Sequence, residues 1–363
     1  MSKKMAGIGK QSIMYQTIHR QPADLQRVLD TGWEDAKQAG AKVAEAARTY
    51  IVGIGTSYHA ALFGSWIMRS VGLDARAISS FDFARYPQTY PLTPDDAVIV
   101  LSHSGAKQFS LTALDVAVRA GAALMSVGGI EAKHPGSELI LRTTERERSA
   151  AFTSSHLAAM TVLAQVAVEA RAALGPEAAA GTDTADALRL AISDLPGQIE
   201  SMLAREQDID LLAESTVARH SYVVGGGPSE VAAIEAVIKG REAAYVRIDG
   251  MALEQFIHGP MICLQQDDTV VLVNVAGASS ERNGDAAQLL QTLGVQFWTV
   301  GTDLDGNAGS FAVPETVEVL SPILTTVPMQ LWAWQMATLQ QIDPDTFRRQ
   351  DPRFAQAVGD ITL

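Results

Sequence analysis

Two carboxylates, an ammonium and an imidazole lie close together in the sequence between residues 235 and 260. Glu235, Lys239 and Glu242 are spaced by four and three residues, which places them on one face of a helix. His258 follows Glu242 by sixteen residues, in a His-Gly-Pro turn whose glycine and proline restrict the backbone. A carboxylate and a histidine in one pocket could transfer protons near neutral pH. Taken singly, the same residues also fit a surface ion pair and a loop histidine with no catalytic role.

The residues around these charges predict a half-buried helix. The neighbouring positions are small or apolar, namely Ala236, Val237, Ile238, Ala243, Ala244 and Tyr245. Such neighbours leave little of the helix surface to water. We therefore expect this helix to carry its charges partly out of solvent.

Two serine- and glycine-rich turns follow predicted strands earlier in the chain. The first reads Gly55-Thr56-Ser57, and the second reads Ser102-His103-Ser104-Gly105 with Lys107 close behind. Turns at the carboxyl ends of parallel strands bind ligands in open α/β sheets. Hydroxyls, backbone amides, a lysine and a helix N-terminus together could hold a phosphate. Each serine alone could be a helix cap, but two such turns in one sheet favour a phosphate site.

Composition and charge narrow the class of protein. The chain of 363 residues is 47% hydrophobic, which is enough for two domains with full cores. A net charge of −13 argues against nucleic acid or an anionic membrane as a partner. A small anionic substrate remains compatible, because backbone amides bind phosphate without net positive charge. No run of about 18 apolar residues and no signal peptide is evident, so we expect a cytoplasmic protein.

The chain has one cysteine, Cys263, which excludes an internal disulfide and a multi-cysteine metal site. We expect this residue in the core, and we expect neither a metal nor a cofactor.

Strands and helices are predicted to alternate along the chain. Residues 1–13 are expected to be disordered, and a helical pattern runs from about 14 to 47 with an interruption near Gln21-Pro22. Predicted strands cover residues 50–52, 97–101, 122–127 and 139–142, and helices cover 58–71, a segment after 110 and one from about 154. This alternation predicts a parallel sheet covered on both faces. Residues 174–184 are rich in glycine and alanine and are interpreted as a linker before further helix to about residue 212.

The pattern then repeats. Residues 50–55 match 222–227, and residues 95–98 match 267–270, both at an offset of 172 (222 − 50). Residues 121–128 match 294–301 at an offset of 173 (294 − 121). Equal spacing over three strands indicates two copies of one α/β domain.

The two copies differ at the residues that could do chemistry. Copy two has Pro228, Asn274 and Ala276 in place of Thr56, Ser102 and Ser104. Copy one has Phe63, Ile67 and Ser70 in place of Glu235, Lys239 and Glu242. We therefore expect the first copy to bind the anion and the second copy to carry the proton chemistry.

Together these motifs resemble the double sugar-isomerase (SIS) domain of glucosamine-6-phosphate synthase and of related phosphosugar isomerases, deaminases and deglycases, from about residue 14 to 347. The two turns resemble that family's phosphate-binding Gly-Thr-Ser and Ser-Gln-Ser-Gly. Thr153-Ser154 resembles its third substrate loop, where Ala-Ser-Thr is usual. Lys239 and Glu242 match its Lys-Leu-Lys-Glu helix, and His258-Gly259-Pro260 matches its His-Gly-Pro at the same spacing.

The resemblance implies two tandem SIS domains, each a parallel five-stranded sheet flanked by helices in a flavodoxin-like fold. The expected division is an N-terminal arm (1–48), a first SIS domain (49–172), a linker with a helix (173–212), a second SIS domain (213–340) and a tail (341–363). It also implies aldose–ketose isomerisation or deamination of a hexose or amino-hexose 6-phosphate, usually in a homodimer. In that chemistry the histidine, often from the neighbouring subunit, opens the sugar ring, and the glutamate moves a proton between C1 and C2.

The chain also departs from the family. We expect no glutaminase domain before the repeat, and the synthases' C-terminal Leu-Ala-Lys-Ser-Val has no counterpart with lysine in residues 352–358. Lys107 stands where the family has a threonine. A fructosamine-phosphate deglycase and a non-catalytic phosphosugar-binding regulator are the alternatives. A regulator should lack the acid–base residues and carry a DNA-binding module, and this sequence shows the opposite pattern.

Overall fold

The computed structural model describes residues 8–175 and 183–360. The chain divides into two compact units, each with its own sheet. The first-sheet unit comprises Gln21–Glu147, Ser154–Pro196 and Arg353–Leu363. The second-sheet unit comprises Met1–Arg20, Arg148–Thr153 and Gly197–Pro352.

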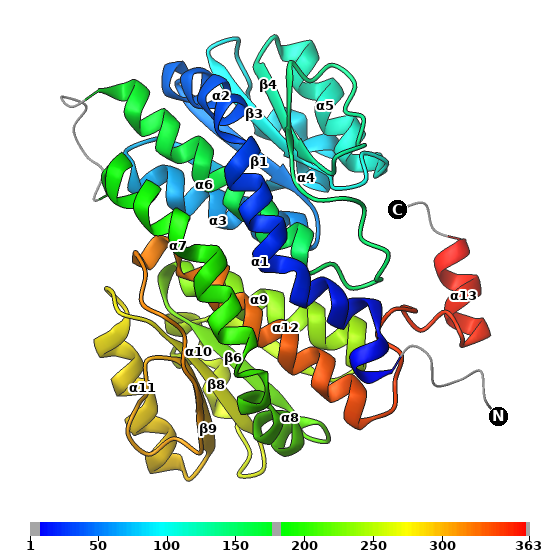
Figure 1. Cartoon of the computed structure of the whole chain (residues 1–363), viewed down its shortest axis with the longest axis vertical. Helices are drawn as coiled ribbons and strands as arrows, with labels where there is room; N and C mark the ends of the chain where they lie inside the picture. Colours follow the sequence, from blue (N-terminus) through cyan, green and yellow to red (C-terminus); the bar gives the residue numbers. More distant parts are fainter. Residues whose placement is uncertain (1–7, 176–182, 361–363) are drawn as a thin grey trace. The chain divides into compact units, whose positions relative to one another are not determined.

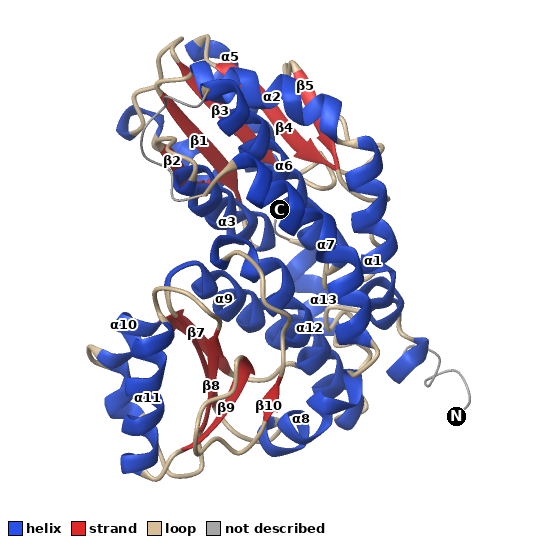
Figure 2. Cartoon of the chain, turned by 60° about the vertical axis from the view of Figure 1, so that its left-hand side comes forward, coloured by secondary structure: helices blue, strands red, loops and turns tan. Residues whose placement is uncertain are grey.

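The first-sheet unit holds a parallel five-stranded sheet in the order β2-β1-β3-β4-β5 (Figures 1 and 2). Its strands are β1 (Arg48–Gly53), β2 (Ala75–Ser79), β3 (Asp96–Leu101), β4 (Ala123–Gly128) and β5 (Leu139–Arg142). This is the flavodoxin-like strand order, which reverses direction between β1 and β3. The carboxyl ends of those two strands are therefore the expected place for a ligand.

Helices cover both faces of this sheet. Tyr50, Val52 and Ile78 pack with residues of α4 (Ser80–Arg85) and α5 (Gln108–Ala120) in one core cluster. On the other face, the space above Ile51 is filled by α3 (Thr56–Ser70) and Leu163 of α6 (Ser154–Leu174), where a Cβ at Gly64 would meet both side chains. α2 (Trp33–Glu45) packs on α6.

The second-sheet unit repeats the arrangement in the order β10-β9-β8-β6-β7, again all parallel. Its strands are β6 (Ser221–Gly225), β7 (Ile248–Ala252), β8 (Thr269–Asn274), β9 (Gln296–Gly301) and β10 (Ser310–Phe311). Its main helices are α8 (Asp210–Thr216), α9 (Glu230–Lys239), α10 (Leu253–Ile257), α11 (Ser280–Leu293) and α12 (Ser321–Leu339). The remaining helices are α1 (Ile13–Thr31), α7 (Ala185–Leu203) and α13 (Pro352–Gly359). The predicted fold of two parallel five-stranded sheets is confirmed.

Three local predictions were wrong. α1 continues through Pro22, and the chain breaks at Gly32, where a Cβ would lie 2.8 Å from the Val28 carbonyl oxygen. Leu25 and Val28 are buried, so packing holds the helix together beyond the proline. Residues 8–13 are ordered, because the Asp345 carboxylate accepts hydrogen bonds from the first backbone amides of α1. Cys263 is exposed, in a short 3-10 helix after the His-Gly-Pro turn.

Two further predictions concern the disordered start and the linker, which are only partly described, and the absence of a long apolar segment. Residues 1–7, and residues 176–182 of the predicted linker, lie outside the described residues. α6 is long and apolar enough to cross a membrane by length and composition, contrary to the expectation of no such run. However, 67% of its most apolar window is buried in the structure, as is typical of a core helix.

Candidate functional site

Glu235 and Lys239 of α9 and Glu242, just after the helix, form a chain of ion pairs. Lys239 Nζ lies 2.8 Å from Glu242 Oε2 and 3.5 Å from Glu235 Oε1. The side chains of Glu235 and Lys239 are 0% and 1% exposed, whereas that of Glu242 is 24% exposed. A buried ammonium must be paired, and Lys239 has a carboxylate on each side. Of the two carboxylates, Glu242 is the one that a substrate could reach.

Glu242 does not continue the α-helix as its spacing suggested. α9 ends at Lys239, and residues Gly240–Ala244 form a π-helical turn that closes at Tyr245 with a left-handed φ of 57°. Gly240 packs closely on β7, since a Cβ there would lie 2.4 Å from Ile248 Cδ1. Single π-helical turns are frequent at functional sites, because they re-aim one side chain. Here the turn places the partly exposed Glu242 side chain in contact with the buried Lys239 ammonium.

His258 occupies a separate position at the surface. Its side chain is 74% exposed and lies 3.2 Å from Glu254, one turn earlier on α10. Gly259 follows with φ 154° and ψ −60°, a backbone conformation that favours glycine. The turn therefore presents an accessible imidazole, and no contact with Glu242 is present among the described residues.

The first predicted phosphate turn joins β1 to α3. Gly55 adopts φ 58° and ψ −134°, which an L-residue rarely takes, and Thr56 is the first residue of α3. A Cβ at Gly53 would lie 2.3 Å from the Ser57 carbonyl oxygen, so the strand meets the helix at a close approach. Thr56 and Ser57 thus stand at the positive N-terminal end of a fifteen-residue helix.

The second predicted turn follows β3, the neighbour of β1 in the sheet. Ser102 is 6% exposed, and its hydroxyl has no hydrogen-bond partner in the described part of the chain. Ser104 Oγ accepts a 3.3 Å hydrogen bond from the Ala106 amide, and Gly105 has φ 64°. Lys107 is exposed at the N-terminus of α5. The two turns therefore lie at neighbouring strand ends where the strand order reverses, and one buried hydroxyl there is unsatisfied.

His103 turns inward instead of toward a ligand. Its ring nitrogens lie 3.4 Å from Thr143 Oγ1 and from the Glu147 backbone nitrogen. It supports the segment after β5, and its inclusion among the phosphate-binding residues stays a prediction.

Sequence reasoning missed His134, which lies beneath the second turn. Its Nε2 donates to the Ser102 carbonyl oxygen at 2.9 Å, and its Nδ1 has no partner among the described residues. Cβ atoms added at Gly105 and Gly128 would come within 3.2 Å and 2.6 Å of its ring. Burial lowers the pKa of His134, and the positive charge of Arg142 lowers it further, against the bond to Ser102. No motif marks this residue, because its role depends on the fold bringing residue 134 under residue 102.

Thr153 and Ser154 are both fully buried. In the second-sheet unit, the Thr153 hydroxyl donates to Thr17 Oγ1 at 2.9 Å. In the first-sheet unit, the Ser154 hydroxyl donates to Asp24 at 2.5 Å, and the Ser154 amide donates to the Glu147 carboxylate at 2.9 Å. Glu147 thus caps the N-terminus of α6. In this structure both hydroxyls are engaged internally, so their predicted contact with substrate would require rearrangement.

Residues 42–169 match the family model described as SIS domain. The glutamine–fructose-6-phosphate aminotransferase of Thermococcus kodakarensis is 26% identical over 344 residues, covering 93% of this chain and 57% of that protein. This chain therefore spans a little over half the length of that relative.

Two solved structures share the fold. The C-terminal domain of glucosamine-fructose-6-phosphate aminotransferase from Francisella tularensis has a TM-score of 0.83 at 17% identity, covering 92% of this chain and 98% of that one. Glucosamine-6-phosphate deaminase from Thermotoga maritima has a TM-score of 0.74 at 19% identity, covering 92% of this chain and 97% of that one. Both matches cover nearly the whole of either chain, so both sheets belong to the shared fold.

Proposed function

We propose that the chain is an enzyme of the phosphosugar isomerase and deaminase class, because residues 42–169 match the SIS domain model and the chain resembles the isomerase part of glucosamine-6-phosphate synthase and phosphosugar deaminases. Its reaction is the aldose–ketose isomerisation or deamination of a hexose or amino-hexose 6-phosphate. The names of the relatives support a phosphosugar substrate, and the chain's own residues support the proton transfer.

The observation that carries the proposal is the buried pairing of Lys239 with Glu235 and Glu242. Burying an ammonium and a carboxylate costs several kcal/mol of desolvation per ion, of which the pairing recovers only part. An ordinary surface helix has no need of such an arrangement. A base that must be fixed in one rotamer does, because the ammonium holds the carboxylate in place.

In the proposed reaction, Glu242 removes the proton from C2 of the open-chain sugar and returns it at C1, or the reverse. Lys239 holds Glu242 in place. His258 protonates the ring oxygen as the sugar opens, and its exposed imidazole is accessible for this step. Thr56, Ser57, Ser102 and Ser104, with Lys107, hold the phosphate at the helix N-termini that follow β1 and β3.

A thermal-shift panel of hexose and hexosamine 6-phosphates tests the proposal. A ligand present at about 100 times its dissociation constant stabilises the folded protein by about 2.7 kcal/mol. We expect one of these phosphates to raise the melting temperature, and the matching sugar without phosphate to leave it unchanged. Failure of every phosphosugar to stabilise the protein would overturn the proposed function. Stabilisation without turnover would favour the regulator instead.

We also propose that the protein assembles at least as a homodimer and that His258 serves the phosphate site of another subunit. The support is the exposure of His258 and the absence of a Glu242 contact among the described residues. Sedimentation should then show a dimer at micromolar concentration. A fully active monomer would contradict this assignment.

A further inference from the structure

The first-sheet unit has a cavity that the proposed reaction does not use. It has a volume of about 480 Å³, within the usual range for small-ligand sites. Its walls come from β1, β2, the start of α4, Tyr58 on α3 and residues 89–91. The residues used below are Arg48, Tyr50, Arg76, Ser79, Asp82 and Tyr90.

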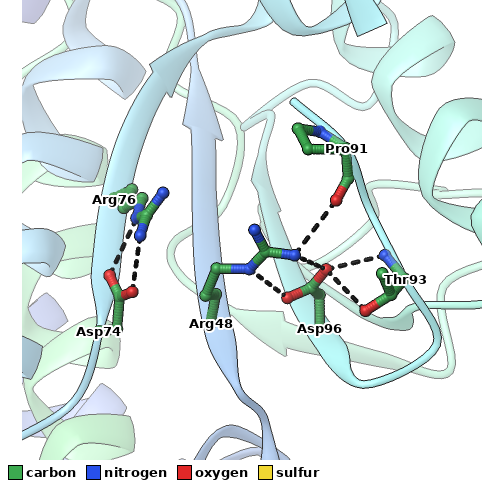
Figure 3. Close-up of polar contacts among 6 residues, drawn as sticks. All are labelled: Arg48, Asp74, Arg76, Pro91, Thr93 and Asp96. Atoms are coloured by element: carbon green, nitrogen blue, oxygen red, sulfur yellow. Dashed lines mark hydrogen bonds and ion pairs between the residues drawn. The ribbon is translucent and has the colours of Figure 1, made fainter. Parts of the chain in front are cut away.

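Two arginines in this cavity are each hydrogen-bonded to an aspartate (Figure 3). Arg48 donates from Nε and Nη2 to Asp96 at 2.8 Å each, and Arg76 donates to Asp74 at 2.9 Å and 2.7 Å. The hydrogen bonds that Arg76 donates to Asp74 raise the pKa of Arg76, whereas burial and, less strongly, the positive charge of Arg48 oppose this rise. In each guanidinium, Nη1 has no partner within the described residues and remains available to an anion (Figure 3).

The fold itself does not require two cations here, as the second-sheet unit shows. Tyr50 is in register with Arg76 on β2, and Tyr222 is in register with Asp249 on β7. His220 takes the place of Arg48 and pairs directly with Asp249 at 2.8 Å. Asp96, the partner of Arg48, has an equivalent in copy two, Asp268. Each aspartate accepts a hydrogen bond at 2.8 Å from a backbone amide three residues earlier, that of Thr93 or of Gln265. In the second-sheet unit Asp249 therefore pairs with both His220 and Arg241, whereas in the first-sheet unit Arg48 and Arg76 each pair with an aspartate of their own.

The same cavity carries a carboxylate. Asp82 of α4 makes no side-chain hydrogen bond or ion pair in the described part of the chain, and within the same residues Ser79 Oγ has no partner either. Asp74 and Asp96 already neutralise the two arginines, so the lining with Asp82 has a net charge near −1. A dianionic phosphate is disfavoured by that balance. A ligand with one carboxylate and one ammonium satisfies both kinds of group.

We propose that this cavity binds a free amino acid, whose carboxylate contacts Arg48 and Arg76 and whose ammonium contacts Asp82. Arginine forks match carboxylates in planar geometry, and here each guanidinium is already hydrogen-bonded to an aspartate. The partly buried ring of Tyr90 gives the amino-acid side chain an apolar surface. The site is independent of the phosphosugar reaction and makes no use of Glu242 or His258.

Saturation-transfer NMR with the intact protein and each standard amino acid tests this, followed by calorimetry on the best binder. Arg76→Gln and Asp82→Asn should each weaken binding by about 10-fold to 100-fold, the effect of losing one hydrogen bond to a charged group. Both positions allow the test without unfolding, whereas changing Arg48 would leave Asp96 buried and unpaired. Arg119→Gln, at an exposed position on α5, is the matched control and should bind normally.

Ligand analogues and one further variant distinguish this cavity from a simple anion site and from the phosphate turns. The amine and the carboxylic acid that each lack one charged group of the amino acid should bind at least about tenfold more weakly. Ser102→Ala should leave amino-acid binding unchanged, because that residue belongs to the phosphate turn. No binding of any amino acid at millimolar concentration would overturn the proposal. Equal binding of the carboxylic acid, or full displacement by inorganic phosphate, would also overturn it.

Discussion

The ammonium of Lys239 is the most demanding single group in the second-sheet unit, because it is buried between two carboxylates. Removing it takes the neighbouring ammonium away from Glu235, whose side chain is fully buried. Breaking one partner of a buried pair typically costs about 3–5 kcal/mol. Lys239→Met should therefore lower the free energy of unfolding by about this amount in urea denaturation.

Two variants act as controls for that result. Glu235→Gln combined with Lys239→Met removes both buried charges and should recover most of the lost stability. Lys42→Met breaks the exposed Lys42–Glu138 pair and should change stability by about 0–1 kcal/mol. Equal unfolding free energies for Lys239→Met and the wild type would show that the ammonium is not buried as described.

His134 gives the first-sheet unit a specific pH dependence. Burial lowers the pKa of His134 in the folded state, so below about pH 6.5 the unfolded chain binds the extra proton first. The stability due to the neutral imidazole is therefore present above pH 6.5 and is lost as the pH falls from there toward the folded-state pKa. His134→Asn should remove this part of the pH dependence in chemical denaturation. His258→Asn, at an exposed site, should keep it, and an unchanged profile in His134→Asn would refute the assignment.

Secondary-structure elements were predicted well where the residue types and the spacing of apolar residues are enough to define them. Buried β-branched strands, the glycine turns and the offset between copies all predicted the two sheets. The π-helical turn at Gly240–Ala244 was not predictable, because its residue types also suit an α-helix and the deciding contact is Gly240 against Ile248. Likewise, the continuation of α1 through Pro22 depends on buried neighbours that the local sequence does not reveal.

In the turn after β3, the Ser102 hydroxyl is expected to lower the stability of the free protein and to contribute to phosphosugar binding. The Ser102 hydroxyl is buried without a protein partner, a situation that costs about 1–3 kcal/mol unless a ligand or water satisfies it. Ser102→Ala should therefore unfold at the same or a slightly higher urea concentration than the wild type. Combined with Ser104→Ala, it should weaken phosphosugar binding by about 1–3 kcal/mol, measured by calorimetry.

The equivalent turn after β8 supplies the control for that change. It carries Asn274, whose amide is already bonded to the Thr302 carbonyl oxygen, and the exposed Ala276. Asn274→Ala and Ala276→Gly should leave phosphosugar binding nearly unchanged. Equal weakening in both copies would contradict the division of roles between them.

Across the whole molecule, one fold has been used twice with different chemistry at equivalent positions. The hydroxyl-bearing turns and the paired arginines belong to the first-sheet unit, and the buried ion-pair chain belongs to the second. The sequence repeat could predict this division, because the offset aligns residues that differ. It could not predict that Thr153 and Ser154 are engaged internally, or that His134 supports the turn, since both depend on contacts between residues distant in sequence.

The most direct test of the account is the exchange of the C2 hydrogen of the bound sugar phosphate with solvent deuterium, followed by NMR. The substrate is the phosphosugar that stabilises the protein best. Glu242→Gln keeps the side-chain shape and removes the base, so exchange should slow by about 10²–10⁴ while affinity changes little. Glu214→Gln, an exposed position in the same unit, should exchange at the wild-type rate. Wild-type exchange in Glu242→Gln would contradict the account and leave Glu242 as an ion-pair partner of Lys239.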